Sequence, residues 1–311
     1  ALIAQGFSQP QQPRNEQSDD SQLISAITTA LNLSPGGTSE QTRKIIQEEV
    51  LVALGNIKGR LSRLENGYAL ASGPAYGQYS RFADAFSRLL QPHKIKLSSL
   101  LTDGGLDNLQ LLRAGKVQLA LSQSDTAYQA LHGIGPFARD GADTQLRALA
   151  SLYPEPVHVL VRSDGPQRIA ELRGKRVNLG LPGSASRDTA LAVLAAHGLQ
   201  TSDLASSSEL DLQSALSALR DGQLDALLQV IGIPADTIRS ASDALDLRLL
   251  ALEPQAIATL QKSRPGTFAF TLPAGSYPRQ QEAVATLAVS SLLLTEQPLT
   301  NHEAQQLLSL L

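Results

Sequence analysis

Residues 147–186 constrain the fold of this chain more than any other stretch. Apolar side chains alternate with other residues over 157–161, which predicts a strand. A second predicted strand, 176–181, ends in the sequence Pro-Gly-Ser-Ala-Ser at 182–186, and a helical pattern follows over 187–197. A strand that leads through a glycine/serine turn into a helix leaves backbone N–H groups free at the positive end of the helix. This turn therefore suits a carboxylate or another anion.

The same alternation of strand and helix recurs on both sides of this stretch. Strands are predicted at 68–71, 95–101 and 117–122, and amphipathic helices lie between them at 80–90 and 106–114. The alternation resumes from 157 to about 250. Strand–helix–strand units produce parallel strands with helices packed against the sheet. The sequence thus predicts an α/β fold.

Charge and composition exclude several classes of partner and site. The 311 residues are 18% charged with a net charge of −3, and no basic stripe with interleaved aromatic residues is present, which argues against nucleic acid. Cysteine is absent, so disulfides and thiolate sites are excluded. No apolar run approaches the roughly 18 residues of a membrane span. Because the chain starts at Ala1 without methionine, we expect that an upstream signal peptide or anchor has been removed.

The first 66 residues differ in pattern from the rest. Residues 8–22 read as a flexible linker and residues 21–33 as a short helix. A longer helix is predicted over 39–65, with the apolar seam Val50, Leu54, Ile57, Leu61 and Leu64 at heptad-like spacing. Two interpretations stand for this seam: it packs on the following domain, or it holds two copies of the chain together.

Several short motifs appear in a fixed order along the chain. They are Gly-Gly-Leu-Asp-Asn-Leu at 104–109, Leu-Ala-Leu-Ser-Gln-Ser-Asp at 119–125, Leu-Arg-Asp-Gly-Gln-Leu-Asp-Ala at 219–226, Ile-Gly-Ile-Pro at 231–234 and Pro-Ala-Gly-Ser-Tyr-Pro at 273–278. Together with the 147–186 stretch, they resemble the TAXI family of TRAP-transporter solute receptors. The resemblance covers about residue 68 to the end and leaves residues 1–66 outside.

The resemblance implies a two-lobed fold of the type II periplasmic-binding-protein class, with a mostly parallel sheet flanked by helices in each lobe and an N-terminal helical extension. Lobe one would hold 67–157 and 253–311, and lobe two 158–252. The two crossings between the lobes are expected near 154–156 and 249–254, where proline stiffens an extended backbone.

Candidate ligand-binding residues follow strands that end at the predicted cleft. The resemblance places contacts in the first turn, at Ser72, Tyr76, Gly77, Gln78 and Tyr79, and the other candidates are Gln123, Asp125, Gly183, Ser184, Ala185, Ser186, Arg187, Gln229 and Pro234. Simpler roles stand beside these: Ser184, Ser186 and Asp125 also suit helix caps. Arg187 also suits a solvated helix start, and Gln229 faces either the cleft or the back of the sheet.

No catalytic or metal-binding set is apparent, because the five histidines are scattered without ligand spacing. We therefore expect no enzyme activity and no cofactor. The resemblance implies an extracytoplasmic receptor that binds a small organic anion or amino acid, such as a dicarboxylate or glutamate-like compound, and delivers it to the permease subunits of a TRAP-type transporter. A ligand-sensing or scaffold domain of a signalling system is the alternative, and an enzyme on the same fold is the least favoured.

Overall fold

In the computed structural model, the described residues are 39–75, 77–296 and 299–311, with single positions between 22 and 31. The chain divides into two compact units, residues 1–65 and 66–311. The predicted linker 8–22 and most of the predicted helix 21–33 lie outside the described residues, as does Tyr76.

The predicted helix 39–65 is observed as α2 (Glu40–Asn66). Ser39 starts it as a cap, because its Oγ accepts a hydrogen bond from the backbone N–H of Thr42 at 3.1 Å. Along the predicted seam, Val50 is buried, whereas Ile57, Leu61 and Leu64 are 56%, 54% and 80% exposed. The C-terminal half of the seam is therefore uncovered in the described part of the chain.

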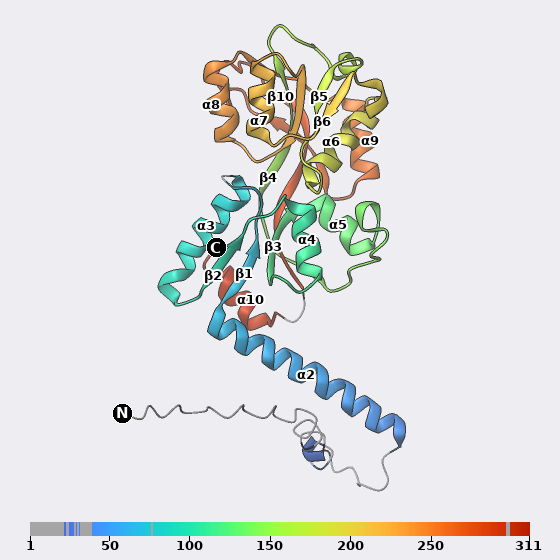
Figure 1. Cartoon of the computed structure of the whole chain (residues 1–311), viewed down its shortest axis with the longest axis vertical. Helices are drawn as coiled ribbons and strands as arrows, with labels where there is room; N and C mark the ends of the chain where they lie inside the picture. Colours follow the sequence, from blue (N-terminus) through green and yellow to red (C-terminus); the bar gives the residue numbers. More distant parts are fainter. Residues whose placement is uncertain are drawn as a thin grey trace, which may run out of the picture. The chain divides into compact units, whose positions relative to one another are not determined.

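The second unit begins with the predicted strand–helix alternation (Figure 1). Its first elements are β1 (Tyr68–Ala71), α3 (Gln78–Leu90), β2 (Leu97–Leu100), α4 (Gly105–Arg113), β3 (Leu119–Gln123) and α5 (Ser124–His132). Next come β4 (Leu146–Arg162), β5 (Arg176–Asn178), α6 (Ala185–Ala196), β6 (Ser206–Ser208), α7 (Leu212–Arg220), β7 (Ala226–Val230), α8 (Asp236–Ala244) and β8 (Leu247–Leu249). The unit ends with α9 (Pro254–Ser263), β9 (Thr267–Leu272), β10 (Val284–Glu296) and α10 (Asn301–Leu308).

The strands form a sheet in the order β2-β1-β3-β10-β4-β7-β5-β6, with β8 beside β4 and β9 beside β10. β1 runs parallel to β2 and β3 in one lobe, and β5 runs parallel to β6 and β7 in the other. β4 and β10 are antiparallel to each other and pass from lobe to lobe in Figure 1. The predicted two-lobed α/β fold is confirmed, but the sheet is mixed rather than mostly parallel, because β4 and β10 pair antiparallel with their neighbours.

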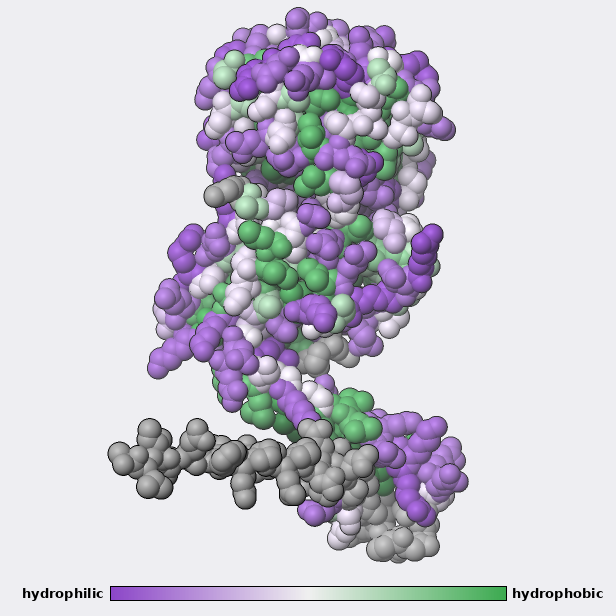
Figure 2. All heavy atoms as spheres, viewed as in Figure 1, coloured by the Kyte–Doolittle hydropathy of each residue, from purple (hydrophilic) through white to green (hydrophobic). Residues whose placement is uncertain are grey.

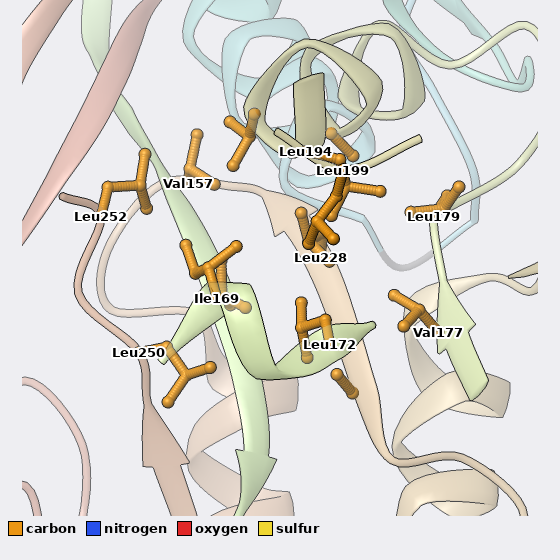
Figure 3. Close-up of a cluster of buried hydrophobic side chains, with 14 of the residues drawn as sticks. Val157, Ile169, Leu172, Val177, Leu179, Leu194, Leu199, Leu228, Leu250 and Leu252 are labelled. Carbon is orange, nitrogen blue, oxygen red and sulfur yellow. The ribbon is translucent and has the colours of Figure 1, made fainter. Parts of the chain in front are cut away.

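Alternating side chains along the strands explain why helices cover both faces of the sheet. Leu70 on β1 packs in a core with α3, while the next residue, Ala71, packs in a core with α4. In the other lobe, Leu227 and Leu228 on β7 likewise enter different cores. Figure 3 shows one of these cores, with Leu228 among leucine, isoleucine and valine side chains from several elements. On the face drawn in Figure 2, hydrophilic residues cover most of the outer surface, with a hydrophobic patch on the lower lobe.

The crossing strands differ from expectation at one point. β4 crosses at the predicted Pro154–Pro156 segment, where Glu155 is opposite Val289 on β10. The segment 249–254 does not cross, since the N–H of Leu250 donates to the carbonyl of Val159 and that of Leu252 to the carbonyl of Ala285. The second crossing is β10 itself.

The core around β5 and β7 contains residues from beyond the predicted end of lobe two. Ile257, Leu260, Leu287 and Val289 all pack in this core. The sequence-based division had placed 253–311 in lobe one. We propose instead that α9, β9 and the first half of β10 move with lobe two.

Candidate functional site

A cavity of about 410 Å³ lies between the two lobes and is lined by both. Lobe one contributes Pro74, Ala75, Gly77, Gln78, Tyr79, Arg81, Asp103, Gly104, Gly105, Gln123 and Glu155. Lobe two contributes Gly180, Leu181, Ser184, Ala185, Ser186, Leu210–Gln213, Gln229–Ile231 and Ala235–Thr237. The size is that of a site for a small organic molecule.

Helix N-termini surround this cavity. The first residues of α3, α4, α6, α7 and α8 all belong to its lining. The first N–H groups of a helix have no partner within the helix, and together with the helix dipole they give its N-terminus a partial positive charge. Each of these helix ends contributes a partial positive charge that suits an anionic group, while Asp103, Asp211 and Asp236 add negative charge to the same lining.

The N-termini of α4 and α6 meet across the cleft. A Cβ placed on Gly104 would lie 3.6 Å from Cα of Ser184, and one placed on Gly105 would lie 3.4 Å from Cβ of Ala185. Any Cβ on Gly105 would also clash with the Ser122 hydroxyl, at 2.7 Å. Glycine at 105 therefore permits the two positive helix ends to approach.

Both predicted serines on the α6 turn line the cavity, and both already have protein partners. The Ser184 hydroxyl caps α6 by accepting from the N–H of Arg187 at 3.2 Å, and it donates to the carbonyl of Leu181 at 2.7 Å. The Ser186 hydroxyl accepts from the N–H of Val230 at 2.8 Å, which ties α6 to β7. The predicted cap role of Ser184 is thus observed, while the Ser186 hydroxyl donates to no group among the described residues.

A buried carboxyl group forms the inner wall of the cavity on the lobe-one side. Glu155 on β4 is 3% exposed. Its Oε2 accepts hydrogen bonds from the hydroxyl of Tyr79 and from Nε2 of Gln123, each at 3.1 Å. Burial raises the pKa of Glu155 to about 8, although these two donors act in the opposite direction. Burial and the nearby Glu155 also raise the pKa of Tyr79.

Sequence reasoning considered Glu155 only as part of a stiff hinge. A signal was present, since a carboxyl side chain stands between two prolines and next to a run of apolar strand residues. An acidic residue buried beside such a strand needs partners or a proton. The sequence-based prediction also missed Arg81, Asp211 and the start of α8 at 235–237, because only the fold places these residues at the cavity.

Two contacts between lobes close one side of the cavity. Gln78 at the start of α3 makes two hydrogen bonds to the backbone of Gly232. Nη1 of Arg81 lies 2.5 Å from Oδ2 of Asp236 at the start of α8. The ion pair is about half exposed, so it contributes little energy, and the shielded Gln78 contact is the better clamp.

The predicted ligand candidate Asp125 does not line the cavity. Its side chain is 1% exposed and lies 2.6 Å from Nη2 of Arg264, which also contacts Asp188 at 2.8 Å. Asp125 also accepts from the hydroxyl of Thr189 at 3.1 Å. These contacts join α5 of lobe one to α6 of lobe two and to Arg264, which directly follows α9, so Asp125 links the lobes.

The remaining candidates divide between the cavity and its surroundings. Gly77, Gln78, Tyr79, Gln123, Ser184, Ala185, Ser186 and Gln229 line the cavity, and Ser72, Gly183, Arg187 and Pro234 do not. Ser72 is fully buried and bonds to Leu100. Arg187 pairs with Glu209 at 2.8 Å instead of pointing to a ligand. The ligand role of the lining residues stays a prediction.

No cluster of three or more His, Asp or Glu side chains suited to a metal ion occurs among the described residues. Within the same residues, no helix is long and apolar enough to span a membrane.

Comparison with known proteins gives one family and a set of structural neighbours. The sequence profile described as the NMT1-like family matches residues 70–311. The alkanesulfonate-binding protein SsuA from Xanthomonas axonopodis pv. citri, bound to MOPS, is 19% identical with a TM-score of 0.50, over 78% of this chain and 71% of that protein. PhnD1 from Prochlorococcus marinus, in complex with methylphosphonate, is 11% identical with a TM-score of 0.50, over 78% of this chain and 83% of that protein. These two structures have the same two-lobed fold.

Proposed function

The chain belongs to the NMT1-like family, and we propose that it is an extracytoplasmic solute receptor of a TRAP-type transporter. The ligand is a small organic anion or amino acid, held between the lobes and delivered to membrane permease subunits. One observation carries this proposal: the cavity is enclosed by both lobes, and helix N-termini from both converge on it. The motifs resembling TAXI receptors support the narrower TRAP assignment.

Ligand binding in such a cavity favours the closed arrangement. A ligand that contacts α4 in lobe one and α6 in lobe two gains its full set of contacts only when the lobes are together. The Gln78–Gly232 contact then adds to the stability of the closed form. The closed form presents a surface across both lobes that membrane subunits can distinguish from the open form.

A thermal-shift screen with the whole chain tests the receptor function. Dicarboxylates and amino acids are the expected binders, and sulfonates and phosphonates belong in the panel because the two neighbours were crystallised with MOPS and methylphosphonate. A ligand at 100 times its Kd stabilises the native state by about 2.7 kcal/mol, which raises the melting temperature measurably. If no compound in the panel raises it and calorimetry detects no binding, the receptor function is wrong.

The transport assignment needs a second test. Uptake of the identified ligand into vesicles that contain TRAP-type membrane subunits should require this chain. A ligand that binds the chain but is never transported with it would favour a sensing role.

A further inference from the structure

At the buried end of the cavity, one amide acceptor has no hydrogen-bond donor among the described residues, and the buried hydroxyl of Tyr153, close to Glu155, is unpaired as well. Oε1 of Gln123 is buried and has no hydrogen-bond partner among the described residues. Glu155 accepts hydrogen bonds from Tyr79 and Gln123 at Oε2, and neither bond uses its second carboxyl oxygen, Oε1. Leaving a buried acceptor unpaired is unfavourable, so a group with several donors is favoured here.

The protein supplies no positive side chain to this end of the cavity. Arg81 is the basic residue among the described lining residues, and it is paired with Asp236. Arg187 is paired with Glu209, and Arg264 is held by Asp125 and Asp188. A carboxylate at Glu155 can therefore obtain a counter-charge only from the bound molecule.

The N-termini of α4 and α6 offer hydrogen-bond donors to the cavity, in contrast to the acceptors of Glu155 and Gln123. The N-termini of α4 and α6 bring together backbone N–H donors and the hydroxyl of Ser186. Of their first residues, Gly105 and Ala185 have no backbone N–H partner among the described residues. Two positive helix ends that lie close together repel each other, and an acidic group that binds beside both ends reduces that repulsion.

We propose that the cavity selects a zwitterion, an amino acid whose ammonium group binds Glu155 and Gln123 and whose acid group binds the N-termini of α4 and α6. This inference rests on the proposed receptor function and narrows its ligand class. An ammonium group offers three donors and the missing positive charge. A dicarboxylate or 2-oxo acid would place an acceptor against Glu155 and would bind only while Glu155 is protonated.

The groups around Glu155 favour a proton on its carboxyl group when no cation is present. Tyr79 approaches from α3, Tyr153 lies on the same strand, and Asp125 acts from α5 while paired with Arg264. Burial, the largest effect, raises the pKa of Glu155 to about 8. An ammonium group from the ligand reverses this preference, whereas a ligand acceptor reinforces it.

The experiment compares each amino acid with the 2-oxo acid of the same side chain, for example L-glutamate with 2-oxoglutarate. Calorimetry at pH 7 with the whole chain should give the amino acid a roughly tenfold or greater advantage in Kd, as expected for one desolvated ion pair. Titrations in buffers of different ionisation enthalpy should show that the oxo acid takes up to about one more proton than the amino acid.

Variants locate the effect. Glu155→Gln should lower the affinity for the amino acid by roughly tenfold or more and leave that for the oxo acid unchanged or higher. Glu282→Gln, an exposed glutamate outside the cavity, should behave like the parent chain. The Kd ratio of amino acid to oxo acid and the number of protons taken up on binding are both measured on the parent chain. The proposal therefore stays testable even if the Glu155→Gln chain fails to fold.

The outcomes separate the two proposals. Equal or tighter binding of the oxo acid, or a preference that survives Glu155→Gln, overturns the zwitterion assignment. Binding of dicarboxylates or sulfonates without amino acids also overturns it, but leaves the receptor function standing. Binding of no small molecule rejects the receptor function and the zwitterion assignment together.

Discussion

The side-chain amide of Gln78 pairs with both backbone groups of Gly232 across the cleft. Its Oε1 accepts from the Gly232 N–H at 2.7 Å, and its Nε2 donates to the Gly232 carbonyl at 3.0 Å. A Cβ on Gly232 would lie 2.6 Å from Oε1 of Gln78, so only glycine leaves room for this contact. The pair is a polar contact between the lobes, and opening of the cleft would break it.

Replacing Gln78 with Ala should shift the population toward the open form. Loss of two hydrogen bonds should weaken ligand binding by about 1–2 kcal/mol, mainly through faster dissociation. Stopped-flow binding and small-angle scattering report the two effects. Gln110→Ala, an exposed glutamine on α4, is the control. Unchanged dissociation kinetics in Gln78→Ala would show that the clamp does not hold the closed form.

The ion pairs of Arg264 with Asp125 and Asp188 should make the largest contribution of any ion pair between the lobes to the stability of the protein. Arg264→Met leaves Asp125 buried without its positive partner, which should lower the free energy of unfolding by about 3–5 kcal/mol. Arg220→Met breaks the exposed pair with Asp221 and should cost less than about 1 kcal/mol. Urea denaturation measures both, and equal losses would mean that the buried network adds nothing beyond a surface pair.

The pH dependence of stability should reveal Glu155. Its pKa in the folded protein is raised from 4.5 to about 8, so the folded state keeps a proton that the unfolded chain loses. Its contribution is complete below pH 4.5 and is lost as pH rises to about 8, with a slope of at most about 1.4 kcal/mol per pH unit.

Two other groups act at lower pH. Burial lowers the pKa of His158 from 6.5 to about 4, so its contribution is present above pH 6.5 and is lost as pH falls toward 4. Burial and Asp143 raise the pKa of Glu296 to about 7. Between pH 7 and 8, therefore, Glu155→Gln should flatten the decline in unfolding free energy. A parent chain whose stability is constant over this interval would contradict the prediction.

Ser184 and Ser186 should differ in their effects on stability. Ser186→Ala leaves the buried N–H of Val230 without an acceptor and should cost about 1–3 kcal/mol. Ser184→Ala removes a helix cap and should cost about 1 kcal/mol. Ser240→Ala, at an exposed position in α8, should be nearly neutral. Thermal melting without ligand measures all three, and calorimetry then shows whether either hydroxyl also contacts the ligand.

Residues 1–65 should be dispensable for ligand binding, because every residue that lines the cavity lies in the unit 66–311. A chain that begins at Asn66 should keep its affinity. The exposed Ile57, Leu61 and Leu64 predict that the association state or solubility changes on deletion. Sedimentation and calorimetry test both points, and a well-folded shortened chain that no longer binds ligand would show that the first unit takes part in binding.

The sequence by itself determined most of the elements up to about residue 250 and the α/β class of the fold. Alternating valines over 157–161 and the glycine/serine turn at 182–186 are local patterns, and local patterns report strands, turns and caps directly. Because strands that end in such turns meet at one sheet edge, Tyr79, Gln123 and Ser184 could be assigned to one cavity in advance.

Only the tertiary structure decided which polar groups face the cavity and which hold the lobes. Asp125 lies two residues from Gln123, yet it turns away to Arg264, which is 139 residues further along the chain. Glu155 becomes part of the cavity through its hydrogen bonds with Tyr79 and Gln123, which lie on other elements. Its pKa is raised by burial, which no local sequence pattern indicates. The second lobe crossing is β10 for the same reason: sheet pairing between distant segments depends on the whole packed core.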